Sequence, residues 1–259
     1  MTREAIRGAI RRGLKRGALP PDQAAMLHAR MARPPRQLIP ARSQVPRPEQ
    51  VALLVRNIEK EFGTVTLVAG LDDVPGAVAD YLAAQNLPSE LVMAPHPELQ
   101  AIPWASRPLL QVREGRAEPT DLVSVQHAFA AVAETGTLML PSGPDRPTTL
   151  NLLADTAIAV LRASRVVGAY EDAWDLLRAE SPPQPSGGFM PRNVMLVTGP
   201  SRSADIEQTL ELGAHGPRRL HVVLIEDDPD AQDRDAQDRD AQDRDAQDPG
   251  AQDGAAVER

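Results

Sequence analysis

Residues 194–217, VMLVTGPSRSADIEQTLELGAHGP, contain the pattern that decides the fold. The run begins with apolar, β-branched residues typical of a buried strand, and Gly199-Pro200 then interrupts that strand. A serine after this break can cap a helix, which we predict to continue to Leu212 and to stop at Gly213. The stretch therefore predicts a strand, a polar turn and a short helix in direct succession.

The polar turn is a candidate anion site. Free backbone N–H groups at the start of a helix attract anions, and this turn would lie at the carboxyl edge of the sheet, where open α/β sheets bind ligands. A phosphate, a carboxylate or a nucleotide tail could bind there. Alternatively, Ser201 and Ser203 only cap the helix, while Asp205 and Glu207 complement its dipole. A phosphate-binding P-loop is excluded, because no lysine follows Lys60.

Upstream of this stretch, strands alternate with helices. Residues 64–69 (TVTLVA) and 90–94 (ELVMA) have the character of buried strands, and residues 75–85 between them have a helical pattern. Residues 220–225 (LHVVLI) predict the last strand. Strands that alternate with helices form parallel sheets, because each connection must cross over the sheet. We therefore predict an α/β fold with a mostly parallel sheet flanked by helices.

A second informative stretch, residues 128–140 (AFAAVAETGTLML), is apolar except for its central ETGT. Gly136 is placed to turn the backbone, so either two strands or a helix and a strand meet there. A carboxylate in this setting would be partly desolvated, which suits Glu134 to general base or nucleophile chemistry. The alternative is a structural role, in which Glu134 bonds to backbone amides of the turn with help from Thr135 and Thr137.

Two of the five histidines lie beside these stretches. His127 precedes residues 128–140. Gly216 leaves room for a ligand beside His215, although His215 could instead have only a structural role in this turn. A metal centre would require both histidines and acidic residues to converge, and no short ligand spacing indicates one. We therefore predict no metal, and we take Glu134 and His215 as the candidate catalytic residues.

Charge is distributed unevenly along the chain. Residues 1–47 carry eleven Arg or Lys against two acidic residues, whereas residues 48–226 carry thirteen basic and twenty-two acidic residues. Electrostatic attraction could fold the basic segment onto its own acidic body or onto an acidic partner. Nucleic-acid binding is not expected, because the body is acidic and only 3% of the residues are aromatic.

The two ends of the chain differ from its centre. Residues 3–16 predict an amphipathic helix, and prolines then prevent regular structure until about residue 48. After Asp228 the chain repeats DAQDR, which has too little apolar surface to offset the entropy of ordering. We predict a basic N-terminal helix with a proline-rich strap (1–47), an α/β domain (48–228) and a disordered acidic tail (229–259).

The chain contains no cysteine. This excludes disulfides, a cysteine nucleophile and an iron–sulfur cluster held by this chain, and no other cofactor is indicated. No run approaches the roughly 18 consecutive apolar residues of a membrane span, and the N-terminus lacks the apolar core of a secretory signal. A cytoplasmic protein without a membrane span is expected.

The AETGT stretch at residues 133–137 and the run TGPSRSADIEQTLELGAHGPRRLHVVL at residues 198–224 resemble the LUD-domain family, in particular its lactate-utilisation protein C branch. The resemblance covers residues 48–226. It implies a fold similar to the sugar-phosphate isomerase and CoA-transferase superfamily, and a role in oxidising L-lactate to pyruvate beside two iron–sulfur partner proteins. The resemblance carries over Glu134 and His215 without assigning them roles. It carries over in the same way the residues that we take as candidates for ligand binding, which are Thr135, Gly136, Thr137, Gly199, Pro200, Ser201, Asp205, Ile206, Glu207, Gly213, Gly216 and Pro217.

Two functions stay open at this point. The first is a subunit of an L-lactate utilisation system that contributes a ligand pocket or an assembly surface, without an iron–sulfur cluster of its own. The second is an independent small-molecule enzyme of the isomerase or CoA-transferase kind. In that enzyme Glu134 would act as base or nucleophile, and the turn at residues 199–207 would hold an anionic substrate or CoA.

Overall fold

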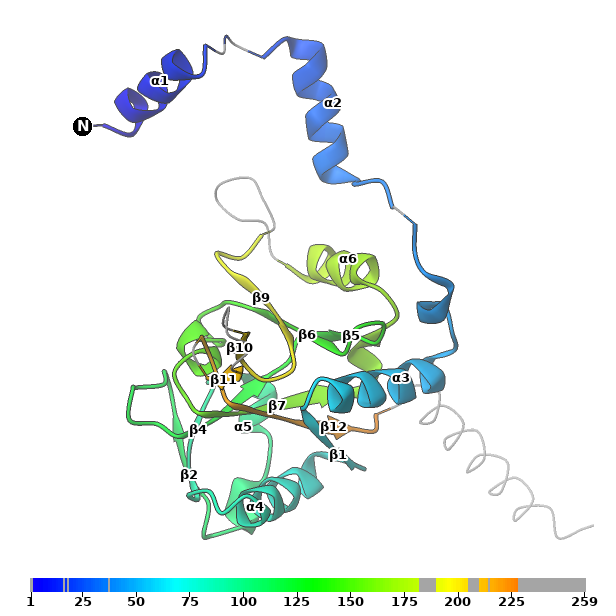
Figure 1. The fold of residues 1–259 in the computed structure, drawn as a ribbon, viewed down its shortest axis with the longest axis vertical. Coiled ribbons are helices and arrows are strands. Elements are labelled where there is room, and N and C mark those ends of the chain that lie inside the picture. Colours follow the sequence, from blue (N-terminus) through cyan, green and yellow to red (C-terminus); the bar gives the residue numbers. More distant parts are fainter. Residues whose placement is uncertain are drawn as a thin grey trace, which may run out of the picture. The chain divides into compact units, whose positions relative to one another are not determined.

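A computed structural model describes residues 2–15, 17, 19–36, 38–181, 190–204, 210–213 and 215–227 (Figure 1). The chain divides into two compact units, Met1–Ile39 and Pro40–Arg259. The acidic tail predicted at residues 229–259 lies outside the described residues. No helix within the described ranges has the length and apolarity needed to cross a membrane, in agreement with the sequence.

The first unit contains two helices, α1 (Arg3–Gly13) and α2 (Pro21–Ala32). The helix predicted from the apolar spacing of residues 3–16 is confirmed by α1. α2 was not predicted, although a proline in its first turn and its alanine content are typical helix signals.

The second unit is built on a six-stranded sheet in which all neighbouring strands are parallel. The strand order is β1-β12-β7-β4-β2-β3. The strands are β1 (Thr64–Val68), β2 (Glu90–Met93), β3 (Gln111–Glu114), β4 (Val123–His127), β7 (Thr156–Arg162) and β12 (Arg219–Ile225). This arrangement confirms the predicted parallel sheet.

A second, four-stranded sheet has the order β8-β5-β6-β9. Its strands are β5 (Ala130–Val132), β6 (Thr137–Pro141), β8 (Val166–Val167) and β9 (Val194–Thr198). β5 and β6 pair antiparallel, so two strands meet at Gly136, which is one of the two arrangements predicted there. The strand predicted at the start of residues 194–217 is therefore present, but it belongs to this second sheet and not to the parallel one.

Four helices complete the second unit. They are α3 (Arg47–Lys60), α4 (Val74–Ala84), α5 (Pro97–Gln100) and α6 (Tyr170–Glu180). In Figure 1, α4 lies at the bottom of this unit and α6 at the top, with the two sheets between them. α6 packs on the second sheet through Ala173 and Leu177, while α3 contributes Leu54 and Ile58 to the core between the two sheets.

Alternate residues of β7 face two different cores. Ile158 and Val160 face the core formed with α4 and α5. The smaller Ala157 and Ala159 face the core formed with α3 and the second sheet. Because successive side chains of a strand point to opposite faces, this alternation places the small residues where the second sheet packs. The second sheet can therefore approach the parallel sheet closely.

The helix predicted from the serines after Pro200 to Leu212 is wrong. β10 (Arg202–Ala204) pairs antiparallel with β11 (Leu210–Leu212), so this stretch contains a two-stranded ribbon. The prediction rested on capping and dipole signals, and a cap contributes only about 1 kcal/mol. Backbone pairing between the two segments outweighs a local preference of that size.

His221 is buried in the parallel sheet. It is 2% exposed, its Nδ1 lies 2.8 Å from the Thr64 hydroxyl oxygen, and its ring stacks on Tyr81 with the centroids 3.9 Å apart. Burial disfavours the charged imidazolium and lowers the pKa of His221 to about 4. The folded protein therefore holds this histidine in its neutral form at neutral pH.

We predict that acid destabilises the second unit through His221. His221 binds a proton with the ordinary pKa of 6.5 in the unfolded chain and with a pKa of about 4 in the folded chain. Its contribution to the free energy of unfolding is therefore complete above pH 6.5 and is lost as the pH falls toward 4. The free energy of unfolding should fall by at most about 3 kcal/mol over this range. Urea unfolding of the full chain between pH 4 and 7 measures it. His221→Phe keeps a ring against Tyr81 and should flatten the pH dependence; an unchanged slope would contradict this explanation.

Candidate functional site

The two stretches singled out in the sequence meet where β6 and β9 pair. Thr137 lies opposite Thr198 in the antiparallel register, and their hydroxyl oxygens are 2.6 Å apart. The hydroxyls of Thr135 and Tyr170 complete the cluster, at 2.7 Å and 2.9 Å from Thr137 Oγ1. Thr137 is fully buried, so these hydroxyls satisfy one another. The threonines of the AETGT stretch therefore join the two stretches together.

The glycines of the two stretches pack against the end of α3. Gly136 and Gly199 both adopt left-handed backbone conformations, with φ of 69° and 74°. A methyl group at Gly136 would lie 2.8 Å from the backbone of Asn57, and one at Gly199 would overlap the carbonyl oxygen of Glu61. Only glycine combines this conformation with such close approach. Both motifs are therefore held against the same helix turn.

Glu134 is engaged by two groups near α3. Its backbone carbonyl accepts a hydrogen bond from Asn57 Nδ2 at 3.0 Å, and its carboxylate pairs with Arg42 at 2.7 Å. The Glu134 side chain is 11% exposed, whereas that of Arg42 is 69% exposed. These contacts describe a carboxylate that fixes the segment before α3 to the β5–β6 turn.

A cleft of about 260 Å³ opens between β9 and the loop that leads into β12. The sequence-predicted residues that line it are Gly199, Pro200, Ser201, His215, Gly216 and Pro217. Ser201 Oγ accepts a hydrogen bond from the backbone N–H of His215 at 3.2 Å, which closes the corner between the two segments. Gln126 and Asn151 add polar groups to the lining, and Ala157, Met195 and Leu220 add apolar ones.

The remaining predicted site residues lie elsewhere. Glu134, Thr135, Gly136, Thr137 and Gly213 are outside the lining of this cleft, and Asp205, Ile206 and Glu207 are outside the described residues. The predicted position at the carboxyl edge of the parallel sheet is also wrong. β9 belongs to the second sheet, and the loop that carries His215 leads into the beginning of β12.

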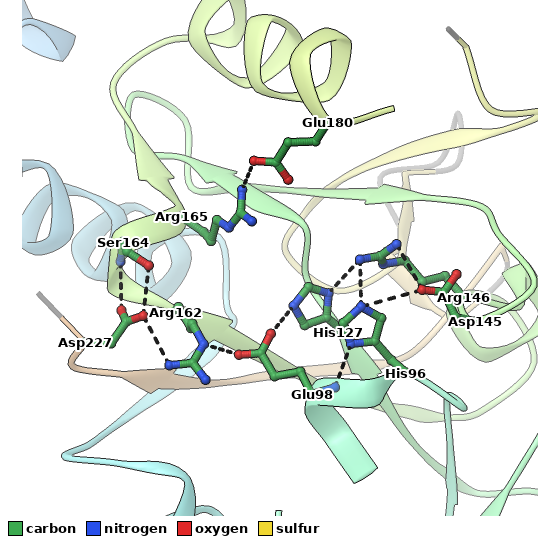
Figure 2. Close-up of polar contacts among 10 residues, drawn as sticks. All are labelled: His96, Glu98, His127, Asp145, Arg146, Arg162, Ser164, Arg165, Glu180 and Asp227. Atoms are coloured by element: carbon green, nitrogen blue, oxygen red, sulfur yellow. Dashed lines mark hydrogen bonds and ion pairs between the residues drawn. The ribbon is translucent and has the colours of Figure 1, made fainter. Parts of the chain in front are cut away.

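The carboxyl edge of the parallel sheet instead carries a network of charged and imidazole side chains (Figure 2). His127 ends β4, Arg162 ends β7, and Asp227 follows β12. Glu98, in α5, lies between them, with its carboxylate 2.7 Å from His127 Nε2 and in contact with Arg162 Nε. Asp227 pairs with Arg162 at 3.2 Å. One carboxylate thus links the ends of two neighbouring strands.

On its other side, His127 adjoins Arg146. Arg146 Nη2 lies 2.8 Å from His96 Nε2 and 3.4 Å from His127 Nδ1, and the two imidazole rings stack with their centroids 3.9 Å apart. Asp145 pairs with Arg146 at 3.2 Å. The segment between β6 and the short helix η4 (Thr148–Asn151) therefore brings a guanidinium against both histidines.

The electrostatics of this network set the protonation of its members. The hydrogen bond from His127 lowers the pKa of Glu98 to about 2, and burial lowers the pKa of His96 to about 4, with His127 and Arg146 adding to the effect. An ionised carboxylate can only accept hydrogen bonds, so His127 donates to Glu98 through Nε2. The lone pair on His127 Nδ1 then faces Arg146.

Within the described residues, one group of three potential metal ligands comes together, His96, Glu98 and His127, with their ligand atoms all within 4.8 Å of one another. Its geometry does not favour a cation. The two rings lie nearly parallel, at 10°, so their in-plane lone pairs do not converge on one point, and Arg146 brings a positive charge to both. The arrangement fits a hydrogen-bonded network better than a metal site.

Sequence patterns do not reveal this network directly, because its members come from distant segments. His96 and Glu98 lie in a short proline-containing segment after β2, and Arg146 lies in the segment after β6. One signal was present: residues that directly follow predicted parallel strands share one edge of the sheet. Grouping the polar residues at predicted strand ends would have placed His96 beside His127.

We predict that Gly136→Ala destabilises the second unit by about 2 kcal/mol or more. A non-glycine residue in the left-handed region costs about 1 to 2 kcal/mol, and the methyl group would also press on α3. Chemical denaturation of the full chain measures the effect. Gly70→Ala is the matched control, because Gly70 is extended and has open space around it. Equal stabilities for the two variants would show that α3 does not restrain the turn.

We predict that Glu98→Gln costs about 1 to 3 kcal/mol of stability at pH 7, because it removes the charge that holds both His127 and Arg162 in a partly buried site and leaves Arg162 with Asp227 alone. Glu98 is 19% exposed, so the loss should be smaller than for a fully buried ion pair. Glu59→Gln, on the exposed surface of α3, provides the control and should change little. Indistinguishable unfolding midpoints for the two variants would argue against a stabilising network.

Comparisons with known proteins connect this architecture to a family. The LUD domain family model matches residues 122–225. Lactate utilization protein C of Bacillus licheniformis is 34% identical over 112 residues, which cover 43% of this chain and 45% of that protein. The protein of the same name from Bacillus subtilis is 34% identical over 105 residues, covering 40% and 42%. An uncharacterized protein of Neisseria meningitidis serogroup B is 40% identical over 101 residues, covering 39% and 41%. The chain thus matches less than half the length of these relatives.

A solved crystal structure of a DUF162 family protein from Deinococcus radiodurans shares the fold, with a TM-score of 0.53 and 23% identity over 70% of this chain and 99% of that one. The family match begins just before β4 and ends with β12. It therefore includes His127, Gln126 and the residues on both sides of the cleft. Residues 122–225 thus match the LUD domain family model, and proteins named Lactate utilization protein C are among the sequence relatives of this chain.

Proposed function

We propose that this chain takes part in lactate utilisation as a component that binds a small molecule. The observation that carries the proposal is the match to relatives named Lactate utilization protein C, at 31–34% identity. The LUD match at residues 122–225 contains the centre of the parallel sheet and the cleft beside β9. The matched segment therefore contains the cleft in which the chain would bind a small molecule.

The cleft supports a binding role. Its volume of about 260 Å³ suits a small metabolite rather than a large cofactor. Ser201 and His215 line it, together with Gly199, Gly216 and Pro217. We propose these residues as the ligand-binding part of the site that the sequence predicted.

The alternative, an independent isomerase or CoA-transferase-like enzyme with Glu134 as base or nucleophile, has less support. Glu134 pairs with Arg42 and lies outside the cleft lining, so its surroundings favour a structural role. The predicted turn at residues 199–207 includes residues outside the described part of the chain. The proposal of a pathway component therefore rests on more observations than the proposal of a free-standing enzyme.

We further propose that iron–sulfur proteins are the partners of this chain. The chain has no cysteine and so lacks the usual ligands for an iron–sulfur cluster. If lactate is oxidised in a complex that contains this chain, electrons must leave through other subunits. Co-purification of the full chain with cysteine-rich proteins would support this assignment.

Deletion of the gene in the source organism tests the proposed function. We expect growth on L-lactate as sole carbon source to be lost, and growth on pyruvate to be kept, because the block would precede pyruvate. Re-expression of the full chain should restore growth on L-lactate. Normal growth of the deletion strain on L-lactate would overturn the proposal.

A further inference from the structure

A small cavity of about 10 Å³ lies between the cleft and the charged network. Gln126 and Asn151 line both this cavity and the cleft. His127 and Arg146, which belong to the network, line the cavity alone. The cavity therefore adjoins both the cleft and the charged network.

Two residues of this cavity contain buried polar atoms without a hydrogen-bond partner in the described structure, Gln126 Oε1 and Arg146 Nε. Gln126 is only 5% exposed, and the other residues of its strand, β4, are buried as well. An unpartnered buried polar group costs about 1 to 3 kcal/mol, so such groups in a native protein call for an explanation. One atom is an acceptor and the other is a donor.

The size of the cavity limits what could satisfy both atoms. A volume of about 10 Å³ is close to the minimum that holds one water-sized group. A hydroxyl group has this size, donates one hydrogen bond and accepts others. It could donate to Gln126 Oε1 and accept from Arg146, whereas a carboxylate has no proton for Gln126 and is too large.

We propose that this cavity is the hydroxyl subsite of the cleft, and that the cleft binds a small 2-hydroxy acid. The hydroxyl group enters the cavity between Gln126 and Arg146, and the rest of the molecule occupies the cleft. There Asn151 and Ser201 offer hydrogen bonds to the carboxylate. The inference rests on the proposed role in lactate utilisation, because that role selects hydroxy acids among hydroxyl-bearing ligands.

The network behind the cavity suits this ligand. Glu98 holds the proton of His127 at Nε2, which leaves the Nδ1 lone pair on the side of Arg146. Among the described residues, Arg146 pairs with one carboxylate, Asp145 at 3.2 Å, and otherwise contacts two imidazoles. Its buried Nε–H therefore remains free to donate to a hydroxyl oxygen in the cavity.

Calorimetric titration of the full chain with L-lactate and with propionate tests the proposal. Propionate has the same carboxylate but lacks the hydroxyl. We expect L-lactate to bind at least about 10-fold more tightly, which corresponds to about 1.4 kcal/mol. Gln126→Met removes the acceptor at similar size and should reduce this ratio to about 1. Gln111→Met, on the exposed side of β3, is the matched control and should keep the wild-type ratio.

Each other outcome overturns the inference. Equal affinities of the wild-type chain for the two acids would show that the cavity holds a structural water only, and this comparison does not depend on how a variant folds. A ratio that survives Gln126→Met, or no binding of either acid, would also exclude the hydroxyl subsite. If growth on L-lactate needs the chain while L-lactate does not bind, the subsite fails and the proposed function stands. Normal growth of the deletion strain on L-lactate would overturn the proposed function, whatever the titration shows.

Discussion

The last turn of α3 packs directly on the backbone of two turns that are far apart in the sequence. Gly136 and Gly199 leave no space for a side chain there, and Asn57 holds the carbonyls of the β5–β6 turn. Arg202 then pairs with Glu61 at 2.5 Å, just beyond the same turn of helix. Because one rigid helix end contacts both turns, the position of β9 against the parallel sheet, and with it the wall of the cleft, depends on this contact.

The second sheet can lie so close because of the composition of the parallel strands. Ala157 and Ala159 of β7 present small side chains to it, whereas Ile158 and Val160 fill the opposite core. A larger residue at Ala157 would project into the cleft, which this alanine lines. The alternation of small and large residues along β7 therefore both allows the second sheet to pack closely and leaves space for a ligand in the cleft.

The parallel sheet and its crossover helices were predictable because their signals are local. The run TVTLVA and the run LHVVLI each identify a buried strand within a few residues, and β1 and β12 occur there. The ribbon of β10 and β11 was not predictable in the same way. Its pairing joins two segments across a turn and outweighs local cap signals that favour a helix.

The candidate site was predictable in part. Six predicted residues of the 194–217 stretch line one cleft, because they lie in the two segments that border it. Glu134 pairs instead with Arg42, a contact across ninety-two positions that no local pattern signals. Gln126 and His127 were open to inference, since both are polar residues in the buried strand VSVQH. Their meeting with Arg146 depends on the path of a later segment, which periodicity does not show.

The space between Gln126 and Arg146 is the proposed place for a ligand hydroxyl, next to a cleft whose wall depends on α3 and the second sheet. A crystal structure of the full chain grown with saturating L-lactate tests this most directly. We predict lactate in the cleft, with its hydroxyl oxygen within hydrogen-bond distance of Gln126 Oε1 and of the Arg146 guanidinium. An ordered water in the cavity, with lactate bound elsewhere or absent, would contradict the account.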